Sequence, residues 1–302
     1  MLEILGFGKA VPEKVVTNFD FEKTLETSDE WIVTRTGIRE RHFANGESNA
    51  SLSSKAAKNC IETNNINKEK IKVLIVATFT PDFHTPSVST MVAGNLGLNE
   101  DIICFDLNAA CAGFMYALNT AASLLKGDEI ALVVGGEIIS THVDMTDKTT
   151  CVLFGDAAAA AALKRNSEKQ FAFISGTRPN QEVLYCNMDN RIIMHGQEVY
   201  KFATEIGKVS INRLLEENNL TKDDIKCIVC HQANIRIIET ISKRTKIEMD
   251  KFYVNIHKYG NTSAASIPLA LSEIWHTFSP GDKIICVGFG AGLVYGGILI
   301  TV

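Results

Sequence analysis

The sequence predicts an α/β fold built from two structurally similar halves, and two observations support this prediction. ETNNINKEKIK (62–72) and EENNLTKDDIK (216–226) share six of eleven positions, at an offset of 216 − 62 = 154. The same offset matches VLIVA (73–77) with CIVCH (227–231) and KGDEIALVVGG (126–136) with PGDKIICVGFG (280–290). Because one offset holds over so long a span, we infer a structural repeat rather than chance similarity.

Apolar runs and helical periodicity alternate within each half. KVLIVATF (72–79) and KCIVCH (226–231) are short continuous apolar runs, typical of strands buried on both faces. After Cys111, apolar side chains recur at helical spacing at Phe114, Met115, Leu118, Ala121, Ala122 and Leu125. Gly127 suits the end of that helix, and the last ten residues, 293–302, predict a strand. Each half should therefore contain a sheet covered by helices.

Length and composition limit the classes of protein. The 302 residues suggest about two domains, and we expect halves 1–165 and 166–302, joined within the polar stretch 163–170. A net charge of −5 argues against general binding to nucleic acid or anionic membranes. No apolar window is long enough to span a membrane, and the N-terminal apolar stretch is too short for a secretory signal. The eight cysteines lie mostly in apolar runs, so we expect reduced thiols in a cytoplasmic protein.

The segment DLNAACAGF (106–114) surrounds Cys111 with small residues. The strand IICFDLN (102–108) precedes it, and a helix is expected to begin at about Cys111. At a helix N-terminus, unpaired amides and the helix dipole favour an anion, and a cysteine pKa falls from about 8.5 to about 3.5–7.5. We interpret Cys111 as a nucleophile whose small neighbours leave room for a substrate carbonyl. The alternative is an inert core thiol.

The offset of 154 also suggests partners for this cysteine. Added to Ala77, at a strand end, it gives His231; added to Leu107, just before the cysteine turn, it gives Asn261. We therefore expect Cys111, His231 and Asn261 to meet at the seam between the halves. For His231 alone, a core histidine without a chemical role is the alternative.

Two short patterns resemble cofactor sites. CIVCH (227–231) matches a haem attachment pattern and half a zinc site, but it lies in a predicted buried strand of a chain without an export signal. GFGAG (288–292) resembles a dinucleotide-binding loop, but a strand rather than a helix follows it. We expect neither a metal nor a redox cofactor. The amides of the glycine loop could instead stabilise an oxyanion.

Four segments together resemble β-ketoacyl-acyl-carrier-protein synthase III. They are TSDEWIVTRTGIRERH (27–42), ACAGFMYAL (110–118), VCHQANIRII (229–238) and HKYGNTSAASIPLAL (257–271). The resemblance extends along almost the whole chain. It implies the thiolase fold, with two βα halves in a five-layer αβαβα arrangement, usually as a homodimer. It also implies a catalytic Cys-His-Asn site at Cys111, His231 and Asn261.

The resemblance implies an acyltransferase that begins fatty acid synthesis from an acyl-CoA primer and malonyl-acyl carrier protein. Cys111 would become acylated, and the amides of Cys111 and Ala291 would form the oxyanion hole. His231 and Asn261 would stabilise the enolate that forms as CO₂ leaves malonyl-acyl carrier protein. The acyl-CoA is a substrate, and no cofactor is implied.

The resemblance assigns further residues around this site. CoA contacts fall on Thr27, Trp31, Arg35, Lys148 and Asn234. Trp31 would stack on the adenine. Lys148 stands where some members have an arginine, and lysine cannot stack in the same way.

Two more sets of residues are implied for partners and primers. Carrier-protein docking falls on Arg236, Lys243 and Arg244, and residues 236 and 243 would share one helix face. Thr85 matches a residue that crosses the dimer interface and closes the partner's primer pocket. Because threonine is small, we expect longer or branched primers to be accepted. The short segment 177–197 also lies near the family's substrate entrance.

Three other functions remain open at this point. A related Cys-His-Asn condensing enzyme could make a specialised acyl product. A cysteine hydrolase could use the same three residue types. A non-catalytic subunit is the third alternative, and the intact Cys-His-Asn set argues against it.

Overall fold

The structure, a computed structural model, describes residues 1–189 and 191–302 and is dominated by two sheets. The first has the strand order β1-β7-β6-β4-β5, and the second has the order β11-β12-β13-β8. Strand bounds in the first sheet are β1 Leu2–Ala10, β4 Ile71–Ala77, β5 Ile103–Leu107, β6 Ile130–Glu137 and β7 Ala157–Arg165. Those in the second are β8 Phe171–Asn180, β11 Ile225–Cys230, β12 Lys283–Gly290 and β13 Gly292–Thr301.

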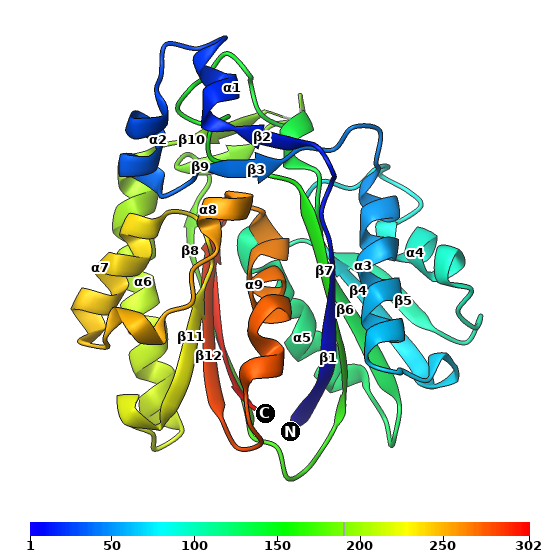
Figure 1. Ribbon diagram of the computed structural model, residues 1–302. Coiled ribbons are helices and arrows are strands. Elements are labelled where there is room, and N and C mark those ends of the chain that lie inside the picture. The colour runs from blue at the N-terminus through cyan, green and yellow to red at the C-terminus, as the bar shows by residue number, and fades with distance from the viewer. Residues whose placement is uncertain (190) are drawn as a thin grey trace.

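Helices cover both sheets and fill the space between them (Figure 1). The outer helices are α3 Asn49–Thr63 and α4 Val88–Leu96 on the first sheet, and α6 Gly196–Glu217 and α7 Ile235–Thr245 on the second. Between the sheets lie α5 Gly113–Leu124 and α9 Ser266–Ile274. This is the predicted five-layer αβαβα arrangement, and the predicted fold class is confirmed.

Smaller elements gather at one end of the layers, above the ends of the central strands (Figure 1). They are β2 Val15–Thr17, α1 Asn18–Glu22, α2 Asp29–Thr36, β3 Glu40–His42, β9 Leu184–Cys186, β10 Ile192–Met194 and α8 Ile256–Tyr259. Seven 3₁₀ turns are found within residues 1–189 and 191–302: η1 Lys68–Lys70, η2 Ala110–Ala112, η3 Ile139–Thr141, η4 Lys222–Asp224, η5 Met249–Lys251, η6 Ser263–Ala265 and η7 Trp275–Thr277.

Burial explains why the apolar segments form these elements. β4 and β6 lie inside the first sheet and are covered by helices on both faces, so their apolar side chains need not alternate with polar ones. The helix predicted after Cys111 is confirmed as α5, and both sheets bury it. It begins at Gly113 rather than at Cys111, because Ala110 adopts a positive φ of 45° and a 3₁₀ turn precedes the helix.

The two halves repeat, but the single offset of 154 is wrong for part of the chain. Asn65 and Asn219, which follow α3 and α6, keep that offset and share φ values of 52° and 54°. The left-handed residues before α5 and α9 are Ala110 and Ser263, at an offset of 153. The register therefore slips by one residue, because the connections between equivalent elements differ in length. Asn261 consequently corresponds to Asn108 rather than to Leu107.

The structure shows which segment joins the two sheets, and it places the C-x-x-C pattern in β11. Residues 166–170 connect β7 of the first sheet to β8 of the second, and the division of the chain at 165/166 stays a prediction. Cys227 and Cys230 belong to different core clusters on opposite faces of β11, so they cannot bind one ion together. Within residues 1–189 and 191–302, no helix combines the length and apolar character needed to cross a membrane.

Candidate active site

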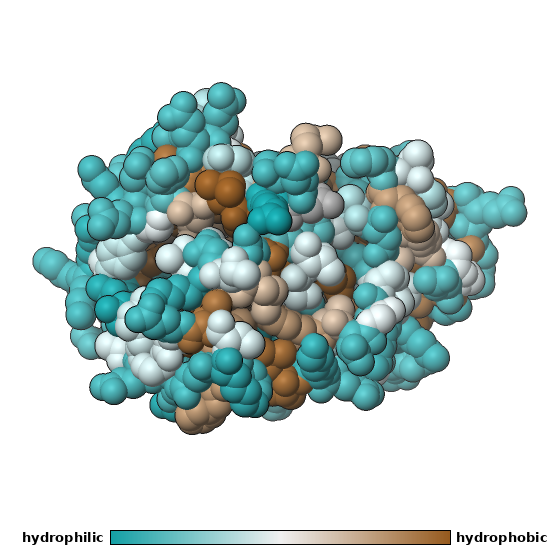
Figure 2. Space-filling model, turned by 90° about the horizontal axis from the view of Figure 1, so that it is seen from above, coloured by the Kyte–Doolittle hydropathy of each residue, from teal (hydrophilic) through white to brown (hydrophobic). Residues whose placement is uncertain are grey.

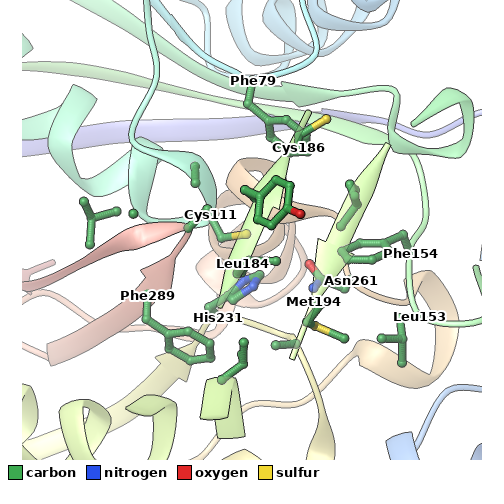
Figure 3. Close-up of a pocket in the computed structure, with 18 of the residues that line it drawn as sticks. Phe79, Cys111, Leu153, Phe154, Leu184, Cys186, Met194, His231, Asn261 and Phe289 are labelled. Atoms are coloured by element: carbon green, nitrogen blue, oxygen red, sulfur yellow. The ribbon is translucent and has the colours of Figure 1, made fainter. Parts of the chain in front are cut away.

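A pocket of about 590 Å³ lies above the ends of the central strands and is lined from both halves. Figure 2 shows the face above it, where apolar side chains gather across the middle and polar ones surround them. Cys111, His231 and Asn261 all line this pocket. Figure 3 shows their polar atoms directed toward one space, so the predicted convergence at the seam is found.

Cys111 occupies η2, immediately before α5, and is partly exposed to the pocket. Dense protein around the sulfur raises the pKa of the Cys111 thiol to about 12; the Ser263 hydrogen bond lowers it, and the charge of Glu137 raises it further. The sequence predicted a lowered pKa, and the structure contradicts that prediction. The strand ends and η6 enclose the turn, so the effect of desolvation on the pKa outweighs the opposite effect of the helix N-terminus.

His231 follows β11 and is 1% exposed. Its Nδ1 lies 2.8 Å from Oγ of Ser266, and the same oxygen accepts the Gln232 N–H at 3.1 Å. The hydroxyl hydrogen is therefore free to donate to Nδ1, which leaves the proton of the neutral ring on Nε2. Burial lowers the pKa of His231 to about 3, so the ring is neutral near pH 7 and Nε2–H is a donor.

The peptide group of Asn261 is tied to residues of the first half. Its N–H donates to the Leu153 carbonyl at 2.8 Å, and its own carbonyl accepts the Gly155 N–H at 3.1 Å. Its Oδ1 accepts the Ser263 N–H at 2.9 Å, so the donating Nδ2 remains for the pocket. The preceding Gly260 has a φ of 64°, and a Cβ there would lie 2.8 Å from the Leu153 carbonyl oxygen. Glycine is required at this turn.

The turn between β12 and β13 contacts the cysteine turn directly. A Cβ on Gly290 would lie 2.8 Å from the Cys111 backbone nitrogen, so only glycine permits this approach. The next residue, Ala291, lines the pocket. The backbone amides of Cys111 and Ala291 thus belong to segments in contact, as an oxyanion hole requires. The GFGAG loop continues into β13, as predicted.

Ser263 and Glu137 lie behind the cysteine, and the sequence analysis did not single out either of them. Glu137 ends β6 and is 0% exposed, and its Oε1 accepts the Ser263 hydroxyl at 3.0 Å. Burial raises the pKa of Glu137 to about 7, although hydrogen bonds from Thr80, Ser263 and Thr78 oppose the shift. The only signal in the sequence is one acidic residue ending an apolar run.

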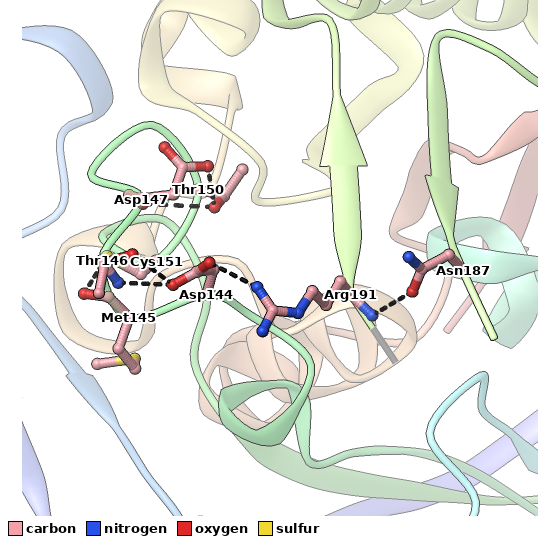
Figure 4. Close-up of polar contacts among 8 residues, drawn as sticks. All are labelled: Asp144, Met145, Thr146, Asp147, Thr150, Cys151, Asn187 and Arg191. Carbon is pink, nitrogen blue, oxygen red and sulfur yellow. Dashed lines mark hydrogen bonds and ion pairs between the residues drawn. The ribbon is translucent and has the colours of Figure 1, made fainter. Parts of the chain in front are cut away.

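The far wall of the pocket is apolar and includes the β9–β10 hairpin (Figure 3). Its labelled side chains are Phe79, Leu153, Phe154, Leu184, Cys186 and Met194. A contact network holds the hairpin against the segment that follows η3 (Figure 4). Arg191 Nη1 lies 2.7 Å from Asp144 Oδ2, and the Arg191 N–H donates to Asn187 Oδ1 at 2.8 Å. This network fixes part of the segment 177–197.

A second pocket of about 470 Å³ adjoins the first, and both are lined by Leu153, Gly196, Tyr200 and Asn234. Trp31 and Lys148 also line it. The Arg35 guanidinium lies 4.4 Å from the Trp31 ring centre and the Lys148 ammonium lies 6.0 Å from it. Asn234 joins the walls by donating from Nδ2 to the Arg35 carbonyl at 2.8 Å. An aromatic ring and cations thus adjoin the cysteine pocket.

The other predicted positions are dispersed. Thr27 lines neither pocket of the described chain, and its Oγ1 is buried without a partner among the described residues. Arg236 lines the second pocket, whereas Lys243 and Arg244 lie exposed in the last turn of α7. Thr85 is exposed in the loop before α4 and lines neither pocket of this single chain.

Comparisons with known proteins agree with this geometry. Residues 105–178 match the family model 3-oxoacyl-[acyl-carrier-protein (ACP)] synthase III, and residues 215–302 match the model of its C-terminal part. The beta-ketoacyl-[acyl-carrier-protein] synthase III of Clostridium acetobutylicum is 44% identical over 99% of this chain and 98% of its own. That of Acholeplasma laidlawii is 42% identical over 100% and 98%.

A solved structure shows the same similarity in three dimensions. The 3-oxoacyl-[acyl-carrier-protein] synthase III of Aquifex aeolicus superposes with a TM-score of 0.96 at 38% identity, over 100% of both chains. Family models, full-length relatives and fold therefore agree with the resemblance of the four segments. The chain belongs to the β-ketoacyl-[acyl-carrier-protein] synthase III family.

Proposed function

We propose that this enzyme carries out the initiating condensation of fatty acid synthesis, joining an acyl-CoA primer to malonyl-acyl carrier protein. The observation that carries the proposal is the convergence of Cys111, His231 and Asn261 in one pocket that adjoins a cation- and tryptophan-lined pocket. The names of the full-length relatives favour this reaction over a specialised acyl product, hydrolysis or a non-catalytic role.

The first half-reaction acylates the cysteine. The Cys111 sulfur attacks the thioester carbon of the acyl-CoA, an S–C bond forms and CoA leaves with the thiol proton. The amides of Cys111 and Ala291 stabilise the tetrahedral oxyanion. In the second pocket, Trp31 offers a stacking face for adenine. Arg35 and Lys148 offer positive charge for the phosphates of CoA.

The second half-reaction condenses the acyl group with malonyl-acyl carrier protein. His231 Nε2–H and Asn261 Nδ2–H donate to the thioester carbonyl, and the C–C bond to the carboxylate breaks as CO₂ leaves. The enolate carbon attacks the acyl-cysteine carbonyl and releases the Cys111 sulfur. Two neutral donors suit this step, because they stabilise negative charge without adding a positive charge to a buried site.

The partners and the compartment are part of the proposal. The basic end of α7, at Lys243 and Arg244, offers a surface for an acidic carrier protein. A homodimer is supported by β5, an edge strand with Ile103 49% exposed. Asp106 of β5 binds the start of α4 through the Val88 N–H at 2.7 Å, which brings the Thr85 loop near that edge. Eight free thiols suit the cytoplasm.

The test combines acyl-CoAs of several chain lengths with malonyl-acyl carrier protein and identifies the products by mass spectrometry. We expect a β-ketoacyl-acyl carrier protein two carbons longer than the primer, and branched or longer primers should be accepted. The variant Thr85→Phe should shift the preference toward acetyl-CoA. Release of free acid without a malonyl-dependent product would instead identify a hydrolase.

A further inference from the structure

Glu137 at the end of β6 has no role in the two half-reactions above, yet its side chain is fully buried. Burying a carboxylate is costly unless hydrogen bonds replace those that it made with water. Its donors are hydroxyl and backbone N–H groups from two separate places, the residues after β4 in the first half and η6 in the second. Glu137 therefore joins the two halves of the chain.

The Oε2 atom of Glu137 is held by the segment that follows β4. It accepts the Thr78 hydroxyl at 3.0 Å, the Thr80 hydroxyl at 2.6 Å and the Thr80 N–H at 3.2 Å. Asn49 fixes this segment in turn, since its Nδ2 donates to the Thr78 hydroxyl at 2.9 Å and to the Gly136 carbonyl at 2.9 Å. Because Oε2 is anchored in this way, the direction of Oε1 is fixed as well.

The Oε1 atom binds the turn that carries Asn261. It accepts the Ser263 hydroxyl at 3.0 Å, and the Ser263 N–H donates to Oδ1 of Asn261 at 2.9 Å. A backbone N–H must face an oxygen, so the second bond decides how the side-chain amide is oriented, with Oδ1 toward the turn and Nδ2 left for the pocket. Two hydrogen bonds in series thus connect Glu137 to a donor of the active site.

The first half contains the same turn without this hydroxyl. Asn108 corresponds to Asn261, and its Oδ1 accepts the Ala110 N–H at 3.1 Å. Ala110 has a left-handed φ of 45°, close to the 48° of Ser263. Asn108 is exposed, whereas Asn261 is buried. The turn itself therefore does not need the hydroxyl, which is added, with its carboxylate partner, in the half that supplies the donors for the condensation.

We propose that Glu137 is a positioning residue for Asn261 and acts through Ser263. By holding the Ser263 hydroxyl, it keeps the turn 261–263 in the conformation that directs Asn261 Nδ2 into the pocket. This role rests on the proposed function, in which Nδ2–H donates to the thioester carbonyl of malonyl-acyl carrier protein. Without the bond to Oε1 the turn is free to move, and the donor is less well aligned with the enolate as it forms.

A positioning role separates the two half-reactions. Burial is the main reason that the pKa of the Cys111 thiol is raised to about 12, and the negative charge of Glu137 adds to it. A variant without that charge should therefore become acylated at Cys111 no more slowly than the unmodified protein. The same variant should decarboxylate malonyl-acyl carrier protein more slowly, because Asn261 is misaligned. General destabilisation would instead slow both half-reactions.

The experiment measures decarboxylation of malonyl-acyl carrier protein without a primer, so that acylation of Cys111 does not enter. Ser263→Ala removes the hydroxyl and keeps the backbone, since Ala110 adopts the same left-handed conformation. Its rate should fall on the order of tenfold, because the lost hydrogen bond involves a charged group. Glu137→Met should lose at least as much. Glu137→Gln should keep most of the rate, since an amide can still bond Ser263, and Ser272→Ala, outside the pocket, is the matched control.

A double-mutant cycle shows whether the effect passes through the asparagine. If Ser263 acts through Asn261, adding Ser263→Ala to Asn261→Ala should not lower the decarboxylation rate further. Acylation of Cys111 by an acyl-CoA is measured in Glu137→Met and should be unchanged or faster. Where Glu137→Met does not fold, the Ser263 and Asn261 variants decide alone.

Each contrary outcome has a distinct meaning. Normal decarboxylation in Ser263→Ala would overturn the positioning role, as would a further tenfold loss when that change is added to Asn261→Ala. Equal losses of decarboxylation and acylation in Glu137→Met, or a loss in Glu137→Gln as large as in Glu137→Met, would overturn it too. A normal decarboxylation rate in Asn261→Ala itself would instead count against the proposed function.

Discussion

The Ser266 hydroxyl lies 2.8 Å from Nδ1 of His231, close enough to hold that ring nitrogen in a hydrogen bond. Its oxygen also accepts the Gln232 N–H at 3.1 Å, and its hydrogen is free to donate to Nδ1, which leaves the ring proton on Nε2. The Nε2–H donor of the site thus depends on a residue of α9. The protonation state of His231 is built into the packing of α9 against β11.

Replacing Ser266 with alanine should slow the condensation and spare the acylation. One hydrogen bond of this kind contributes about 1 kcal/mol, so the condensation rate should fall about fivefold. Rates of Cys111 acylation and of malonyl-acyl carrier protein decarboxylation, measured separately, check this expectation. Ser272→Ala, on the same helix but outside the pocket, is the control. Equal losses in both half-reactions would point to general destabilisation instead.

Reversing the charge of Lys243 should weaken use of the carrier protein. Lys243 is the better choice for reversal, since Arg236 also lines the second pocket. We expect the Lys243→Glu variant to raise the KM for malonyl-acyl carrier protein on the order of tenfold at low salt, with the difference shrinking as salt rises. Lys208→Glu, exposed on α6, is the matched control. An unchanged KM would show that the end of α7 is an ordinary solvated surface and not a docking site for the carrier protein.

Breaking the Arg191–Asp144 contact should alter primer selection more than stability. Exposed ion pairs contribute about 0–1 kcal/mol, so Arg191→Ala should change the free energy of unfolding by less than about 1 kcal/mol. The hairpin that it holds lines the pocket, so the ratio of kcat/KM between long and short acyl-CoAs should change. Arg213→Ala, which removes an ion pair on α6, should leave this ratio as it is.

Glu273 on α9 should make the protein sensitive to acid. Burial alone would raise its pKa, but hydrogen bonds from Lys9, Asn255 and Tyr259 outweigh burial and lower the pKa to about 2. The stabilisation is therefore present above about pH 4.5 and is lost as the pH falls toward 2. In the unmodified protein, the urea midpoint should be lower at pH 3 than at pH 7. In Glu273→Gln, this difference between the two midpoints should be smaller. Glu248→Gln, with an exposed side chain, should keep the original difference.

The convergence of Cys111, His231 and Asn261 was accessible from the sequence, because repeated βα units place equivalent strand ends at one seam. The raised pKa of Cys111 could not be predicted from the sequence. A position just before a helix does not show how tightly the strand ends and η6 enclose the sulfur. The equivalence of Asn261 to Asn108 was also missed. One residue of difference in loop length shifts the register without changing either motif.

Glu137 is a clearer example of a site residue that the sequence alone does not reveal. In the sequence it is one carboxylate among many, and its importance comes from contacts with residues distant along the chain. Ser263, 126 residues away, donates a hydrogen bond to its Oε1. Such a relation depends on tertiary packing, which periodicity and spacing do not encode.

The central claim is that Cys111 carries the acyl group between two half-reactions. The most direct test incubates the protein with an acyl-CoA alone, digests it and weighs the peptide that contains Cys111. The account predicts one added acyl mass on that peptide, lost again when malonyl-acyl carrier protein is supplied and a β-ketoacyl product appears. Acylation mainly at Cys60, Cys186 or Cys230, or condensation at the normal rate in Cys111→Ala, would contradict it.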